Sequence, residues 1–115
     1  MTDCELLEKA AKAAGYNWRG FSNGGHALLN EDIKTAEPRI PYPCVWNPLE
    51  DYEYAFMLMT KLRMEVACCD GVIVVSYPVG ESRDLESLYQ DVGIDHDKST
   101  ARAIVRAAAA IGESL

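Results

Sequence analysis

The sequence predicts one small α/β (α+β) domain, in which a sheet of about four strands, antiparallel or mixed, packs against three main helices. Three observations support this fold class. Residues 3–14 and about 97–111 repeat small and apolar side chains at three- and four-residue spacings, the period of an amphipathic helix. An Asp-Gly pair at 70–71 separates two β-rich runs, which is typical of a hairpin. The length of 115 residues and the 49% hydrophobic content fit a single domain over 1–115.

Local signals mark the ends of the two outer helices. Thr2 or Asp3 can cap the first helix, and Gly15 follows it where a left-handed C-cap is expected. The last helix runs from about 97 to 111, with Gly112 in the place of a C′ residue. Each helix has one side of small and apolar residues, so each is expected to pack by that side.

A third helix is predicted in the middle of the chain. Asn47 suits the N-cap position, Pro48 suits the first helical position, and Glu50 completes a capping box. The helix is expected to continue to about Leu62. Its apolar side is formed by Tyr52, Ala55, Phe56, Met59 and Leu62, with Leu58 beside them.

The clearest strand pattern lies on either side of Asp70-Gly71. Residues 65–69 and 72–77 are rich in β-branched and small apolar side chains, and the pair between them favours a type I′ turn. The second run is apolar on both faces. It is therefore expected to be a central strand that helices cover on at least one side.

The remaining segments have weaker patterns. Residues 16–30 read as a short hairpin around Asn23-Gly24-Gly25, and three prolines make 31–43 an extended loop. Residues 78–97 are acidic, and their apolar members have the spacing of one or two helical turns: Leu85, Leu88 and Tyr89.

The charge of the chain limits its partners. A net charge of −7 disfavours direct binding of nucleic acid and of anionic membranes, because both depend on an excess of Lys and Arg. The same charge permits a basic protein partner. There is no apolar run of membrane-spanning length and no secretory signal at the start, so we expect a cytoplasmic protein without membrane association.

The sequence has no motif of a known chemistry, neither a phosphate-binding glycine loop nor a nucleophile elbow. The four cysteines lack Cys-x-x-Cys spacing and are expected to be free thiols. His96 lies between Asp95 and Asp97, where capping of the last helix by an aspartate is favoured over a metal site. We therefore expect no catalytic residues, no cofactor and no metal, and a protein that is not an enzyme.

Two groups of residues are candidates for contact with a partner protein. Aromatic side chains near a cation or a proline-rich loop are natural anchors, since Tyr and Trp dominate binding hot spots. The acidic segment 81–97, with six acids and one arginine, offers negative charge. The candidate residues are Trp18, Arg19, Tyr42, Glu81, Asp84, Glu86 and Asp91. A homodimer through the apolar hairpin or an exposed strand edge is a further possibility.

Three stretches resemble a group of small bacteriophage and prophage proteins of unknown function, described as phage α-β-α sandwich proteins. These stretches are Leu6-Leu7 to Gly15, WNPLED at 46–51, and STARAIVRAAAAIG at 99–112. The resemblance implies a small sheet with helices packed against it, encoded by a temperate phage. It transfers no catalytic residue, because the motifs are structural.

The resemblance and the charge together lead to an expected function. We expect a non-enzymatic phage accessory protein that binds and modulates a host protein in the host cytoplasm, in its most concrete form an inhibitor of a CRISPR or restriction defence system. One alternative is a binder of a small nucleotide signal, with Trp18-Arg19 and Arg39 near Tyr42 as the suggestive pairs. A virion assembly component is the other.

Overall fold

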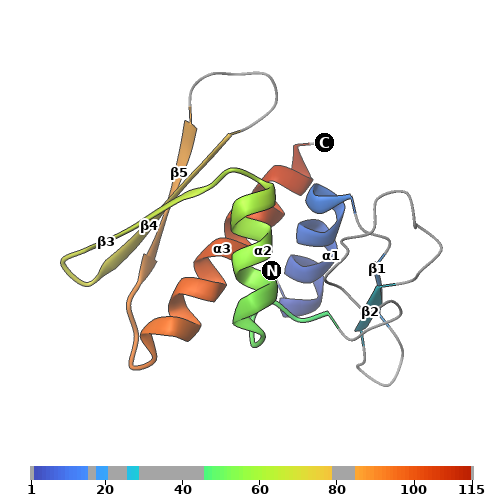
Figure 1. Ribbon diagram of the computed structural model, residues 1–115, viewed down its shortest axis with the longest axis horizontal. Helices are drawn as coiled ribbons and strands as arrows, with labels where there is room; N and C mark the ends of the chain where they lie inside the picture. Colours follow the sequence, from blue (N-terminus) through green and yellow to red (C-terminus); the bar gives the residue numbers. More distant parts are fainter. Residues whose placement is uncertain (1, 16–17, 21–25, 29–45, 79–84, 115) are drawn as a thin grey trace.

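The computed structural model describes residues 2–15, 18–20, 26–28, 46–78 and 85–114 (Figure 1). Three helices are present in this part of the chain: α1 (Asp3–Ala14), α2 (Tyr52–Lys61) and α3 (His96–Glu113). The strands are β1 (Trp18–Gly20), β2 (His26–Leu28), β3 (Glu65–Cys69), β4 (Val72–Pro78) and β5 (Leu85–Asp91). The predicted α+β class is confirmed.

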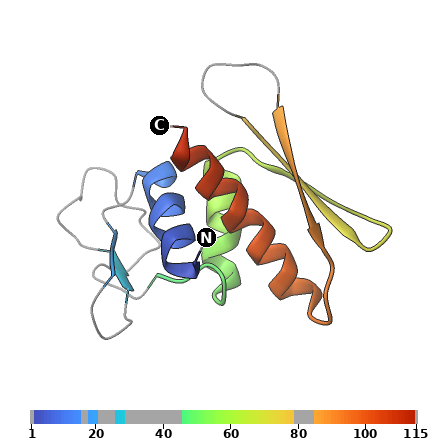
Figure 2. The same ribbon diagram turned by 180° about the vertical axis from the view of Figure 1, so that it is seen from behind.

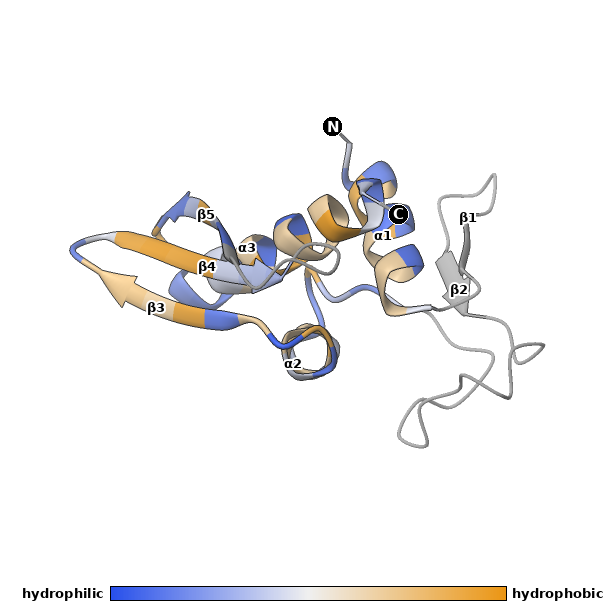
Figure 3. Ribbon diagram, turned by 90° about the horizontal axis from the view of Figure 1, so that it is seen from above, coloured by the Kyte–Doolittle hydropathy of each residue, from blue (hydrophilic) through white to orange (hydrophobic). Residues whose placement is uncertain are grey.

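Helix α3 lies at the centre of the fold. Figure 2 shows it between the sheet and α1, and in Figure 3 it again separates these two, with α2 alongside. It packs against α1, α2, β4 and β5. This central place requires small residues on several sides, which explains why Ala103, Ala107 and Ala108 are fully buried.

Helix α1 forms as its sequence predicts. The Thr2 hydroxyl accepts a hydrogen bond from the Glu5 N–H at 3.2 Å, and Gly15 ends the helix in the left-handed conformation with φ of 79°. Its apolar side, which includes Leu7 and Ala10, is buried against α3. Both predicted caps are confirmed.

Gly112 differs from its predicted role as the residue that ends α3. The helix continues to Glu113, and Gly112 is buried where α3 meets α1. A Cβ atom at this position would lie 2.9 Å from the carbonyl carbon of Lys9. The missing side chain therefore permits close approach of two helix backbones.

Helix α2 begins later than predicted, at Tyr52, with Asp51 as its N-cap. Asn47 instead closes a turn: its Oδ1 accepts from the Leu49 N–H at 3.2 Å, and its carbonyl accepts from the Asp51 N–H at 2.8 Å. Asparagine readily forms such local turns, which compete with helix initiation. Asp51 then accepts from the Glu53 N–H at 3.2 Å.

The main sheet contains three described strands and is antiparallel, in the order β3-β4-β5. The predicted type I′ hairpin is confirmed, because Asp70 and Gly71 have φ of 45° and 80° between paired strand ends. The central place of β4 is also confirmed. The predicted helical turns at 85–89 are wrong, since these residues form β5 along the open edge of β4.

The expected hairpin at 16–30 is confirmed in its strands. Strands β1 and β2 pair antiparallel, with Trp18 opposite Leu28. They form a separate two-stranded ladder that contacts α1. The sheet of about four strands is therefore corrected to one of three described strands plus this ladder. The proline-rich loop predicted at 31–43 lies outside the described residues.

The two faces of the main sheet differ. Ile73, Val75 and Tyr77 of β4 are buried and face α3. Their neighbours on β4 face the other way, and there Tyr89 of β5 is exposed opposite Val74. Helix α3 thus covers the inner face over β4 and β5.

Candidate functional site

A groove of about 260 Å³ runs between α2 and the first half of α3. Apolar side chains dominate its lining. Helix α2 contributes Tyr52, Ala55, Phe56 and Met59, and α3 contributes His96, Asp97, Thr100, Ala101 and Ile104.

Two aromatic side chains of this groove are exposed. Tyr52 and Phe56 are 43% and 54% exposed, while Ala55, Met57 and Leu58 of the same helix are buried. Residues four apart lie on the same face of a helix, so the two rings form one stripe. Adjacent exposed aromatic side chains above an apolar groove are typical of a protein contact site.

Carboxylates surround the Tyr52 end of the groove. The amino ends of α2 and α3 lie near one another, and each begins with acidic residues because these stabilise a helix start. Three of these carboxylates act on Tyr52: Glu50, Asp95 and Asp97. Partial burial raises the pKa of Tyr52, and the negative charges of Asp95, Asp97 and Glu50 raise it further. We call these three carboxylates the acidic rim.

The N-cap of α3 is an aspartate, as the sequence predicts, and the structure identifies it as Asp95. Its Oδ1 accepts a hydrogen bond from the Lys98 N–H at 3.0 Å. His96 turns toward β3, where its Nε2 lies 3.5 Å from the Sγ of Cys68. Within the described residues no three His, Cys, Asp or Glu side chains are grouped to hold a metal ion. The thiols of Cys4, Cys68 and Cys69 are free and exposed.

The residues predicted to contact a partner are not assembled into one surface by the described part of the chain. Trp18 and Arg19 lie on β1, opposite Leu28 and Ala27. Glu86 and Asp91 are exposed at opposite ends of β5, and their five-residue separation directs them to opposite faces of the sheet. Tyr42, Glu81 and Asp84 lie outside the described residues. Partner binding by these residues stays a prediction.

The sequence interpretation missed the exposure of Tyr52 and Phe56, because it assigned both to the packing side of α2. The available signal was the width of the apolar surface. Residues 54–59 of α2 are all apolar, more than one buried side requires. A helix with such a wide apolar surface must bury two sides or leave one exposed.

None of the helices in the described residues is long and apolar enough to cross a lipid bilayer. Comparison of the chain with known protein families, with characterised proteins and with solved structures gives no match. The geometry of the groove is therefore the basis for the functional argument.

Proposed function

We propose that the chain is a non-enzymatic phage accessory protein that binds and modulates a host protein through the groove between α2 and α3. The observation that supports this proposal is the exposed Tyr52–Phe56 stripe beside the acidic rim. Apolar side chains at the centre and charges at the edge are the usual anatomy of a protein interface.

The charges define the chemistry of the partner. A segment that fits the groove has an apolar side chain against Phe56 and Lys or Arg side chains opposite the carboxylates of the rim. Proteins that bind nucleic acid carry such basic surfaces. We therefore propose a CRISPR or restriction complex of the host, in the host cytoplasm, as the most concrete target.

Capture from lysates of several defence-positive host strains tests the proposal. The wild-type chain is compared with a Tyr52→Ser, Phe56→Ser double variant and with Tyr89→Ser, which removes an exposed aromatic ring from the far face of the sheet. We expect a specific host protein to be retained by the wild type and by Tyr89→Ser and lost by the double variant. Thermal melts confirm that all three chains are folded.

Two outcomes would contradict the proposal. Recovery of background proteins alone, across all strains, would argue against a host protein partner. Equal capture by the double variant would show that binding occurs elsewhere on the chain. The acidic rim adds a quantitative expectation: Asp97→Asn slows association and weakens its salt dependence, whereas Lys98→Gln does not, because only the first change removes negative charge.

A further inference from the structure

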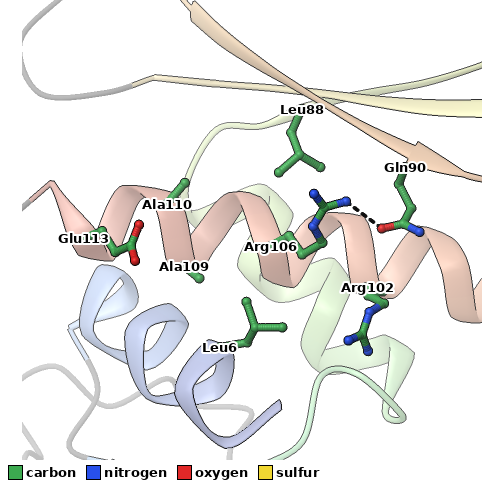
Figure 4. Close-up of a pocket in the computed structure, with 8 residues that line it drawn as sticks. All are labelled: Leu6, Leu88, Gln90, Arg102, Arg106, Ala109, Ala110 and Glu113. Carbon is green, nitrogen blue, oxygen red and sulfur yellow. Dashed lines mark hydrogen bonds between the residues drawn. The ribbon is translucent and has the colours of Figure 1, made fainter. Parts of the chain in front are cut away.

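A second groove, of about 530 Å³, lies on the other side of α3 (Figure 4). It runs between α1, α3 and β5. Helix α3 contributes residues 102, 106, 109, 110 and 113 to its lining. Successive residues of a helix are rotated by about 100°, so these side chains project from the side of α3 opposite to residues 97, 101 and 104, which line the first groove. The two grooves are therefore separate surfaces.

The walls of this groove are apolar and its middle is cationic. The walls are formed by Leu6 of α1, Leu88 of β5, and Ala109 and Ala110 of α3. Figure 4 shows that the side chain of Arg106 reaches toward Gln90 beside Leu88, whereas that of Arg102 points the other way. The volume lies within the range of about 300–1,000 Å³ that is usual for small-molecule sites.

One of the two arginines that line the groove is neutralised by a carboxylate, and the one acid that lines it, Glu113, is paired with a lysine outside the lining. The Nη2 of Arg102 donates to Asp3 Oδ1 at 3.0 Å, and Lys9 forms an ion pair with Glu113. Arg106 differs: its Nη1 donates to Gln90 Oε1 at 2.7 Å and to the Tyr89 carbonyl at 3.2 Å, which are neutral acceptors. No carboxylate of the described residues lies within ion-pair distance of it.

Part of the role of Arg106 is structural. The Val92 N–H donates to the Gly71 carbonyl, so the adjacent Val72–Asp91 pair is a non-hydrogen-bonded pair of the ladder. Because the two kinds of pair alternate along antiparallel strands, Val74–Tyr89 is also a non-hydrogen-bonded pair. The Tyr89 carbonyl therefore points away from β4, and Arg106 covers it at the edge of β5 that pairs with no described strand. This contact occupies Nη1 alone, while a guanidinium also has N–H groups on Nε and Nη2. Among the described residues these two nitrogens donate no hydrogen bond.

We propose that this groove binds a small organic carboxylate with an apolar body. The carboxylate pairs with the Nε and Nη2 fork of Arg106, a geometry that suits bidentate bonds. The apolar body lies along Leu6, Leu88 and Ala110. A single negative charge is required, because Arg106 is the one cation of this groove without a carboxylate partner in the described residues. A half-buried charge without an opposite charge beside it is costly, and the ligand reduces that cost.

Octanoate is the probe, since it combines a carboxylate with a short apolar chain. Acetate has the same charged group without the chain, and octylamine has the chain with the opposite charge. We expect octanoate to raise the melting temperature of the wild type in a saturable manner, and acetate and octylamine to have little effect. Arg106→Gln is expected to weaken octanoate binding about tenfold or more, as loss of a charge-assisted pair predicts.

Arg63→Gln is the matched control, because Arg63 is an exposed arginine at the end of α2, away from this groove. It should leave octanoate binding unchanged. The methyl signals of Leu6, Leu88 and Ala109 in wild-type NMR spectra should shift on titration, a measurement that does not depend on the folding of any variant. Absence of saturable binding, shifts elsewhere, or equal stabilisation by octylamine would each overturn the proposal. None of these results bears on the groove that contains Tyr52 and Phe56.

Discussion

Substituting alanine for Gly112 perturbs the contact between α1 and α3, where the backbones of the two helices approach closely. An added Cβ would overlap the carbonyl oxygen of Lys9 and lie 2.9 Å from its carbonyl carbon, and real Cβ atoms essentially never approach another heavy atom within 3.0 Å. The obstacle is backbone, so no side-chain rotation relieves it. We expect α1 and α3 to separate by a distance on the order of an ångström, which weakens the packing of Ala10 and Ala108.

The size of the effect follows from two opposing terms. Overpacking of a close-packed site costs about 3 kcal/mol at the upper end of the usual range, which is appropriate for a backbone obstacle. Alanine gains about 1 kcal/mol over glycine in a helix interior. The free energy of unfolding should therefore fall by about 2 kcal/mol, which lowers the melting temperature of a chain of this size by about 8 °C.

Thermal melts and urea titrations measure this change. Gly93→Ala is the matched control, since its added Cβ would meet only the Ser99 hydroxyl, at the ordinary distance of 3.4 Å. That variant should stay within about 0.5 kcal/mol of the wild type. If Gly112→Ala melted at or above the wild-type temperature, the close approach of α1 and α3 described above would be refuted.

Three further predictions concern the core, a helix cap and alkaline pH. Leu7→Ala should lower the free energy of unfolding by about 3 kcal/mol, because Leu7 is 1% exposed; the neighbouring surface change Glu8→Ala should have little effect in the same urea titration. Asp95→Ala should lower the free energy of unfolding by about 1 kcal/mol, because the hydrogen bond to the Lys98 N–H is lost. Asp95→Asn keeps an acceptor and should retain most of this free energy. An equal loss in both variants would contradict capping by Asp95. Burial, and then the charge of Glu86, raise the pKa of Tyr77 above its ordinary value of 10.0, although Arg106 opposes this. Because the folded state holds this proton to higher pH than the unfolded state, the contribution of Tyr77 to stability should be fully present below its unfolded pKa and be lost as the pH rises from the unfolded pKa to the folded pKa. Urea midpoints measured from pH 8 to 11 should fall less steeply for Tyr77→Phe, and an equal slope would refute the assignment.

The hairpin and the outer helices illustrate how much of the fold local sequence can predict. Asp70-Gly71 needs positive φ at both positions and favours one turn type, whatever surrounds it. Thr2 and Gly15 likewise act within one turn of their own helix. These signals predicted the elements correctly because the interactions involved span a few residues.

Two of the errors occurred where distant contacts compete with local preference. Leu85, Leu88 and Tyr89 have helical spacing, yet they form β5 because the open edge of β4 requires backbone partners. Gly112 resembles a helix terminator, but contact with Lys9, more than one hundred residues earlier in the chain, places it inside α3. In both cases the deciding partner is remote in sequence.

For the two grooves, the sequence could predict the kinds of residue on each helix but not which helices and strands meet to form a groove. The apolar width of α2 and the acids before each helix are visible in the sequence, whereas their meeting around Tyr52 is not. Similarly, Arg102 and Arg106 share a helix face by their spacing, but β5 and α1 decide that the first is neutralised by Asp3 and the second is not.

The sequence by itself determined the three helices, the caps of α1, the tight hairpin and the negative charge, because periodicity, capping and turn chemistry act over a few residues. Only the tertiary structure decided that α2 leaves Tyr52 and Phe56 exposed and that Arg106 lies half-buried in a groove without a described acidic partner. The physical reason is that burial and charge pairing depend on which distant segments pack together, and no local pattern specifies that choice.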